Sequence, residues 1–300
     1  MSITDELKYT FKNGSYLTRL IYLNLGVFVV VRVIYALLWL VSFDTSTPFI
    51  KEWLSLPAEF PQLITKPWSV MTYMFLHFDF LHILFNMLWL FWFGRIFLEY
   101  LDEKKLLSVY ILGGLTGALF FMLSYNFLPI FSDVLPFAQL MGASAGVVAI
   151  VIASAVYAPN HTINLLFIGQ IKIKYIALIS VLLYVIQIQS SNPGGHLAHL
   201  GGAFWGYLYI SRLQKGQDLA GWFERFIDSV KKSYKTRGSK LKVSHKKSSN
   251  KDYAYNAMKN QKEAQINQIL DKIGKSGYDS LTKEEKAILF KMDRDKKRPN

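Results

Sequence analysis

Six apolar stretches, separated by polar segments, occupy most of the first 213 residues. A helix that spans a membrane needs about 20 mostly apolar residues, and six stretches approach or exceed this length. They are residues 20–42, 80–98, 106–130, 142–158, 173–189 and 196–213. The fourth and fifth are the shortest, so we expect them to be central or tilted. The pattern predicts an all-α polytopic membrane protein with a bundle of six transmembrane helices.

Composition supports this class and excludes several others. Of the 300 residues, 52% are hydrophobic and 18% are charged, whereas a soluble domain has about 25% charged residues. The chain has no cysteine, which excludes a disulfide framework, a thiolate zinc site, an iron–sulfur cluster and a cysteine nucleophile. Neither an HExxH zinc-protease motif nor a phosphate-binding P-loop occurs. We expect no metal and no cofactor.

Loop charges predict the orientation of the spans, because cytoplasmic loops are enriched in Lys and Arg. The N-terminus, the second-to-third and fourth-to-fifth connections and the C-terminal tail are basic. By contrast, residues 43–79, 131–141 and 190–195 contain few Lys or Arg. The two sets alternate as six spans require. Both termini are therefore expected to be cytoplasmic, and spans two, four and six to run from the outer to the inner side.

The longest predicted outer loop is the segment 43–79, which contains four prolines and Trp68. Its second half combines aromatic residues with few charges. That combination is typical of a segment that lies at the membrane interface or dips into it. An ordinary outer loop explains the same composition, and both interpretations stay open.

The last 90 residues are polar and basic. Residues 211–300 hold 23 Lys and Arg against 11 Asp and Glu, which gives +12 of the total net charge of +13. We expect the following four parts: a cytoplasmic N-terminus (1–18), a six-helix membrane domain (19–213), a basic helix and linker (214–260), and a small helical cytoplasmic tail domain (261–300). Ser280 is expected to cap the second helix of that tail domain.

The basic tail also suggests partners. Basic residues next to the cytoplasmic end of a span attract anionic lipid by about 1 kcal/mol each. We therefore expect the tail to contact the anionic surface of the lipid bilayer, with a cytoplasmic protein partner as the alternative. No nucleic-acid partner is expected, although the charge alone would permit one.

Polar side chains inside spans are costly and mark functional positions. His82 and Asn86 lie near the start of span two, Ser144 near the start of span four and His199 near the start of span six. Because these spans run in one direction, the four residues lie at similar depth on the outer side. Serine and histidine together form a nucleophile and its general base. His82 and Asn86 share one helix face and can stabilise an oxyanion.

Small residues provide faces on which two spans can approach closely. They are Gly202 and Gly206 in span six, and Ala145, Ala149 and Ala153 in span four. Close contact of these faces would bring Ser144 and His199 within hydrogen-bond reach.

Each signal also has an ordinary explanation. A GxxxG pair is often only a packing face, and a serine in a span often bonds to its own helix. The remaining histidines near span ends, His77, His161 and His196, are interpreted as interfacial residues. It is the joint placement of the polar groups at one depth that favours a catalytic site.

The polar residues fall into three ordered motifs, His82-x-x-x-Asn86, Gly142-Ala-Ser144 and Ala198-His199-x-Gly-Gly202. Together they resemble the motifs of the rhomboid intramembrane serine proteases, over about residues 20–213. The resemblance implies a six-helix bundle that opens to the outer side. It also implies a Ser–His dyad without a third acid, and cleavage of single-pass membrane proteins in or near their transmembrane segment.

The resemblance implies a role for each residue. Ser144 corresponds to the nucleophile and His199 to the general base. The residues that correspond to oxyanion and substrate-binding positions are His82, Asn86, Gly142 and Phe85, the last as an aromatic that contacts the substrate gate.

The sequence departs from the family pattern at three places. Ala145 replaces the glycine that usually follows the serine, and Ser69 replaces an arginine that often follows the tryptophan of the first loop. Val148 replaces an aromatic residue that often stacks on the catalytic histidine. Other contacts must therefore orient His199.

Two further functions are compatible with parts of the sequence. One is a non-catalytic rhomboid-like protein that binds transmembrane helices for sorting or degradation, although such proteins usually lack the Ser or the His. The other is a haem- or metal-binding protein that uses His82, His196 and His199. The end of the tail resembles a short domain of unknown role behind some bacterial rhomboids. The expected location is a bacterial cytoplasmic (inner) membrane.

Overall fold

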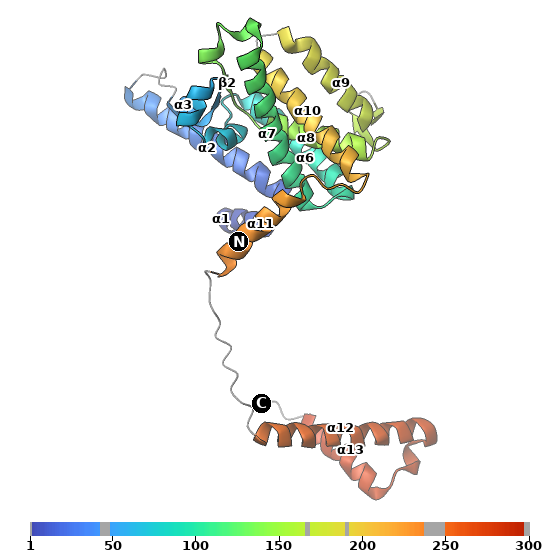
Figure 1. Cartoon of the computed structure of the whole chain (residues 1–300). Coiled ribbons are helices and arrows are strands. Elements are labelled where there is room, and N and C mark those ends of the chain that lie inside the picture. The colour runs from blue at the N-terminus through green and yellow to red at the C-terminus, as the bar shows by residue number, and fades with distance from the viewer. Residues whose placement is uncertain (1, 43–48, 166–168, 190–191, 237–249, 297–300) are drawn as a thin grey trace. The chain divides into compact units, whose positions relative to one another are not determined.

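The computed structural model describes residues 2–42, 49–165, 169–189, 192–236 and 250–296 of the chain. These residues are mostly helical (Figure 1), in agreement with the expected all-α class. The chain divides into two compact units, Met1–Tyr234 and Lys235–Asn300.

The first unit contains six principal helices that follow the six apolar stretches of the sequence. They are α2 (Tyr16–Ser42), α6 (Phe80–Tyr100), α7 (Glu103–Phe127), α8 (Ser144–Tyr157), α9 (Ile173–Ile186) and α10 (Pro193–Leu213). Each begins and ends within four residues of its predicted bounds. The 3-10 turn η4 (Gln187–Gln189) continues α9 to the predicted end of that stretch.

Several of these helices suit an integral membrane protein. Helices α2, α6 and α7 are long and apolar enough to cross a membrane by length and composition. Helices α8 and α9 are also apolar but have 14 residues each, about 21 Å at 1.5 Å per residue. Helix α10 has 21 residues, and its sequence includes glycines and histidines.

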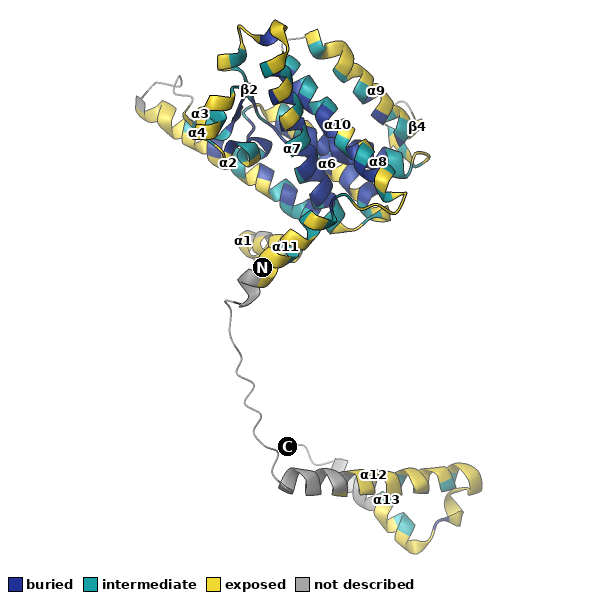
Figure 2. Ribbon diagram, in the orientation of Figure 1, coloured by how far each residue is buried: buried dark blue, intermediate teal, exposed yellow. Residues whose placement is uncertain are grey.

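Helix α8 is the centre of the bundle. Every residue from Ala145 to Ala155 is buried, and α6, α7, α9 and α10 all pack against it. Figure 2 shows this buried centre in dark blue, whereas much of α2 and α9 is exposed. Of the two short stretches, the fourth is therefore central as expected. The fifth forms a peripheral helix, in which only Ile173, Ala177 and Ser180 are buried.

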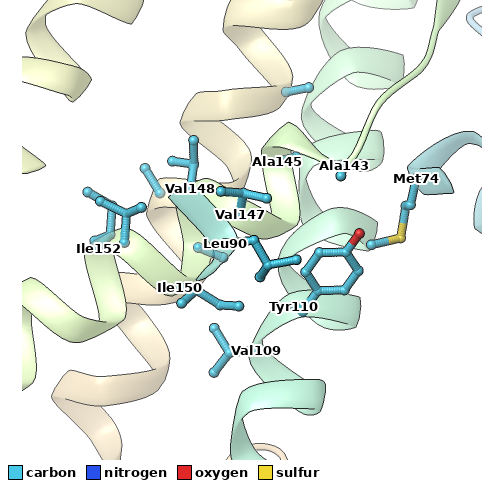
Figure 3. Packing of buried hydrophobic residues seen from close by; sticks show 14 of the residues in the cluster. Met74, Leu90, Val109, Tyr110, Ala143, Ala145, Val147, Val148, Ile150 and Ile152 are labelled. Atoms are coloured by element: carbon cyan, nitrogen blue, oxygen red, sulfur yellow. The ribbon is translucent and has the colours of Figure 1, made fainter. Parts of the chain in front are cut away.

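The predicted small-residue faces of α8 and α10 meet. A Cβ atom added at Gly202 would collide with the carbonyl oxygen of Ala145, and one added at Gly206 with that of Ala149. On other sides of α8, branched and aromatic side chains fill the core. Figure 3 shows Leu90 of α6 and Tyr110 of α7 beside Val147 and Ile150 of α8. Close helix approach on one side and large side chains on the others hold α8 in place.

The described part of the connection between α2 and α6, residues 49–79, contains several short elements. They are α3 (Phe49–Leu54), β1 (Leu56–Pro57), α4 (Phe60–Thr65), α5 (Ser69–Thr72) and η1 (Tyr73–Phe75). Trp68 stacks on Trp53 with ring centroids 5.4 Å apart and donates its indole N–H to the Trp53 carbonyl oxygen at 2.8 Å. Whether the segment enters the membrane interface stays a prediction.

Two short strands join this segment to the chain just before α8. Strand β1 pairs antiparallel with β2 (Gln139–Leu140), with Leu56 opposite Leu140. Two 3-10 turns, η2 (Pro129–Phe131) and η3 (Leu135–Phe137), lead from α7 to β2. A second antiparallel pair, β3 (Thr162–Leu165) and β4 (Gly169–Lys172), connects α8 to α9. The first pair anchors the backbone that precedes Ser144.

Two amphipathic helices flank the bundle in the sequence, α1 (Ile3–Asn13) and α11 (Gly221–Thr236). Arg19 of α2 donates hydrogen bonds to the carbonyl oxygens of Phe11 and Lys12, which attaches the end of α1 to α2. Asp228 of α11 forms an ion pair with Lys104 at the start of α7, at 2.8 Å. Helix α11 falls within the expected basic helix.

The second unit contains α12 (Asn250–Ser276), the 3-10 turn η5 (Tyr278–Ser280) and α13 (Lys283–Lys296). Helix α12 begins eleven residues before the predicted tail domain, inside the expected linker 214–260; residues 237–249 of that linker lie outside the described residues. The prediction that Ser280 caps the second helix is wrong. Thr282 and Glu285 instead form a capping box: each backbone N–H donates to the other's side chain, at 2.8 and 3.2 Å.

Candidate active site

The predicted nucleophile and base lie in direct contact. Ser144 is the first residue of α8, and His199 lies in the second turn of α10. The Ser144 Oγ and the His199 Nε2 are 2.7 Å apart. That distance is a normal hydrogen bond, and it is the geometry in which an imidazole can accept the serine proton. The contact depends on the close approach of α8 and α10.

A strained turn places Ser144. Gly142 has a φ angle of +114°, a backbone conformation that other residues rarely adopt. Its N–H donates to the carbonyl oxygen of Tyr73 at 2.8 Å. A Cβ atom at this position would lie 2.7 Å from the His82 ring. Glycine is therefore required here both for the turn and for the close approach of His82.

The two candidate oxyanion residues lie on one face of α6, as their spacing predicts. The side-chain amide of Asn86 donates to the backbone carbonyl of His82 at 2.9 Å, and its nitrogen lies 3.4 Å from His77 Nε2. The backbone N–H of His82 donates to Oδ1 of Asp79 at 2.7 Å, so Asp79 caps the start of α6. Asn86 is buried, and its position is fixed by these contacts before any substrate binds.

One cavity of about 330 Å³ contains these groups. Ser144, His199, His82, Asn86 and Phe85 all line it. Phe85 is 57% exposed. The remaining lining residues are Asp79, Leu81, Trp89, Val147, Val148 and Tyr184. The structure thus brings these five predicted site residues to one cavity, whereas the sixth, Gly142, does not line it and lies close to the His82 ring. The walls are largely apolar and would surround a peptide segment with little competing water.

Tyr184 of α9 is a site residue that the sequence did not reveal. Its ring lies against the His199 ring, with centroids 4.5 Å apart. Val148 lines the same cavity but carries no ring. The aromatic contact to the histidine therefore comes from a different helix than the family pattern suggests. The sequence carries only a weak signal for it, because Tyr184 is one of two tyrosines, with Tyr175, among the apolar residues of α9.

His77 was interpreted as interfacial, and that interpretation is wrong. The side chain is completely buried, and its Nε2 accepts the N–H of Ala143 at 3.2 Å. Burial, and after it the neighbouring His82, lowers the pKa of His77 to about 4, against a weaker opposing effect of the Phe75 carbonyl. A neutral His77 can accept at Nε2 and so link the turn before Ser144 to Asn86.

The other two histidines have different surroundings. His161 lies 3.0 Å from the Tyr100 hydroxyl, in the connection between α8 and α9. His196 packs edge-on against His199, with ring centroids 5.9 Å apart. In the described part of the chain, no three His, Asp or Glu side chains gather as potential metal ligands.

No carboxylate among the described residues contacts the far nitrogen of the base. The Nδ1 of His199 is buried and has no hydrogen-bond partner within them. The arrangement is a serine–histidine pair rather than a triad with an aspartate. The nearest acidic side chain in the cavity lining is Asp79, which caps α6 instead.

A helical membrane domain with a half-buried serine–histidine pair defines the class of the protein, and sequence comparison gives the family. Residues 65–215 match the family model described as Rhomboid domain, and the chain belongs to the rhomboid family. Residues 249–292 match a second family, described as a family of unknown function (DUF6576). That match covers α12 and most of α13.

A curated relative is similar over about two thirds of the chain. It is the RHOMBOID-like protein 12, mitochondrial, of Arabidopsis thaliana, which is 26% identical over 207 residues. The alignment covers 66% of this chain and 58% of the relative. The chain therefore spans less than two thirds of that relative's length.

Proposed function

We propose that the protein is an intramembrane serine endopeptidase that cleaves single-pass membrane proteins in or near their transmembrane segment. The observation that carries the proposal is the 2.7 Å contact between Ser144 Oγ and His199 Nε2, inside a cavity that His82 and Asn86 also line. Membership of the rhomboid family supports the same activity.

The chemistry follows from the groups present. His199 Nε2 takes the hydroxyl proton as Ser144 Oγ attacks the carbonyl carbon of the scissile bond. Negative charge then develops on the carbonyl oxygen, where the His82 and Asn86 side chains and the Ser144 N–H act as donors. His199 gives the proton to the leaving amine, and the acyl-enzyme forms. Water, activated by His199, attacks the acyl carbonyl and releases Ser144.

The membrane arrangement belongs to the same proposal. We infer that α2, α6, α7, α8, α9 and α10 all cross a bacterial cytoplasmic membrane, with both termini inside and the cavity open to the outer side. The alternation of basic loops with loops that contain few Lys or Arg supports this orientation. Since the chain has no cysteine, single cysteines can map it. Ser132→Cys should react with an impermeant maleimide from outside, and Lys215→Cys only after the membrane is permeabilised.

The test of the activity is a cleavage assay in lipid. Full-length protein is reconstituted with a single-pass substrate whose transmembrane segment contains helix-destabilising residues. Wild type should cleave it, while Ser144→Ala and His199→Ala should give only background product. Ser154→Ala is the matched control, because Ser154 lies on the same helix but bonds to the carbonyls of Ile150 and Phe93. Equal cleavage by wild type and both site variants would refute the proposal.

The competing function is a non-catalytic rhomboid-like protein that binds transmembrane helices. An intact and contacting Ser–His pair favours the protease. A fluorophosphonate probe separates the two without the choice of a substrate, because it reacts covalently with an activated serine. Labelling that is lost in Ser144→Ala would support the protease; folded wild type that stays unlabelled and still retains client helices would support the binding protein.

The basic residues after α10 are proposed to contact anionic lipid, as their charge suggests. A protein partner is the alternative for the second unit. Binding of the full chain to vesicles with and without phosphatidylglycerol distinguishes the two, because only the lipid contact depends on vesicle charge.

A further inference from the structure

A groove outside the active site lies between α1 and α2. It has a volume of about 890 Å³. Its apolar wall is one face of α2, with Tyr22, Leu25, Val29 and Val30, and its other wall is α1. None of these residues lines the cavity that holds Ser144. The groove therefore has no part in the proposed cleavage reaction.

The α2 wall is suited to hydrocarbon. Val29 and Val30 are 56% and 58% exposed, on a helix that is long and apolar enough to cross a membrane. From Tyr22 to Val30 the helix rises about 12 Å at 1.5 Å per residue, a length that much of an acyl chain can cover. Gly26 lies in the middle of this wall, and no atom lies within 4 Å of where its Cβ would be.

The α1 wall is basic. Lys8 and Lys12 line the groove, both are exposed, and their four-residue spacing places them on one face of α1. Arg19 holds this end of α1 on α2 through hydrogen bonds to the carbonyls of Phe11 and Lys12, at 3.0 and 2.8 Å. The two ammonium groups are thereby kept beside the start of a helix that is long and apolar enough to cross a membrane, and in the proposed membrane arrangement phosphate headgroups would lie at this end.

We propose that this groove binds one anionic phospholipid molecule, with its phosphate between Lys8 and Lys12 and one acyl chain along Tyr22, Gly26 and Val30. An apolar channel that ends at a pair of cations has the complementary chemistry of such a lipid. A transmembrane peptide would use the apolar wall but would leave the two lysines without a partner. The bound lipid would fix α1 at the membrane surface, and an amphipathic helix is stable there.

The test measures bound lipid directly and does not depend on proteolysis. Full-length protein is reconstituted in bilayers of equimolar phosphatidylglycerol and phosphatidylcholine, and retained lipid is counted by native mass spectrometry. Wild type should retain phosphatidylglycerol at least fivefold in excess over phosphatidylcholine. Gly26→Leu should fill the groove without a clash, and should reduce retention at least fivefold. The double variant Lys8→Gln/Lys12→Gln should remove the preference for phosphatidylglycerol.

Two controls keep the result specific. Ala36→Leu places the same leucine side chain at an exposed position of α2 that does not line the groove, and it should retain lipid as wild type does. Lys172→Gln/Lys174→Gln removes two charges elsewhere in the first unit and should also have no effect. Equal retention of the two lipids by wild type, or unchanged retention in Gly26→Leu, would overturn the proposal. A purely tail-bound lipid gives that second outcome.

Discussion

The ring of Tyr184 packs against the imidazole of His199, with centroids 4.5 Å apart and planes inclined by 56°. The position four residues after the serine is Val148, which carries no ring, so α9 provides the aromatic contact that orients the base. Contacts between rings are worth about 0.5–1.5 kcal/mol beyond their buried area. The orientation of His199 therefore depends on a residue of a peripheral helix.

Tyr184→Leu should lower the cleavage rate about threefold to tenfold, the range that this contact energy gives. Tyr184→Phe keeps the ring and should stay close to wild type. Adding Val148→Phe to Tyr184→Leu restores a ring near the base and should recover part of the rate. Substrate KM should change little, since the effect acts through His199. A uniform loss in both Tyr184 variants would instead point to the hydroxyl group.

The pKa of His77 predicts a pH dependence of stability. The folded pKa is about 4, below the usual 6.5, so the unfolded chain binds more protons between these values. Stability from the neutral His77 is present above pH 6.5 and is lost as pH falls towards 4, by on the order of 3 kcal/mol. His77→Gln cannot titrate. Its melting temperature in detergent should be lower at pH 7, with a smaller decrease between pH 6.5 and 4 than wild type shows. Parallel curves for the two proteins would contradict the assignment.

Gly142→Ala should inactivate the site. The change places a residue at a φ of +114°, which costs about 1–3 kcal/mol, and pushes a Cβ against the His82 ring. A displacement near 1 Å can cost 100-fold in rate. The matched control is Gly169→Ala, which also has a positive φ, +88°, but open space around it. The control should keep activity; equal activity of the two variants would exclude the proposed contact with His82.

Gly202→Ala should separate α10 from α8. Its Cβ would collide with the backbone of Ala145, the residue after the proposed nucleophile, and such overpacking costs about 1–3 kcal/mol. We expect a lower melting temperature and slower fluorophosphonate labelling of Ser144. Gly26→Ala is the control, because open space surrounds that position, and its melting temperature should match or exceed that of wild type.

The helices of the membrane domain could be predicted because apolar length is a strong signal. The packing of α8 on α10 could also be predicted, since Gly202 and Gly206 match Ala145 and Ala149 in spacing. From that packing and the shared depth of the polar residues, the contact of Ser144 with His199 follows. These inferences rest on periodicity within single helices.

Contacts between distant segments were harder to predict. A lone histidine such as His77 fits an interface as well as a buried site, and only the fold shows that Ala143 presents an N–H to it. Tyr184 and His199 lie on different helices, and no spacing rule relates them. The N-cap of α13 could have been predicted from the sequence, because Thr282 and Glu285 have the spacing of a capping box. Ser280 has a suitable residue type for a cap but lies two residues before the cap that the structure shows, Thr282.

Because Tyr184 belongs to α9, the orientation of the His199 ring depends on the position of that helix. Half of the residues of α9 are exposed and only three are buried, whereas α8 and α10 pack closely against each other at glycine contacts. If the bundle widens to admit a peptide, moving α9 would expose fewer buried residues than moving α8 or α10. An outward shift of α9 would take the Tyr184 ring away from His199. The histidine would therefore lose its orienting contact while the site is open and regain it when the helix returns. Entry of the peptide into the cavity and the reactivity of Ser144 would then alternate, and the contact of Tyr184 with His199 would couple the two.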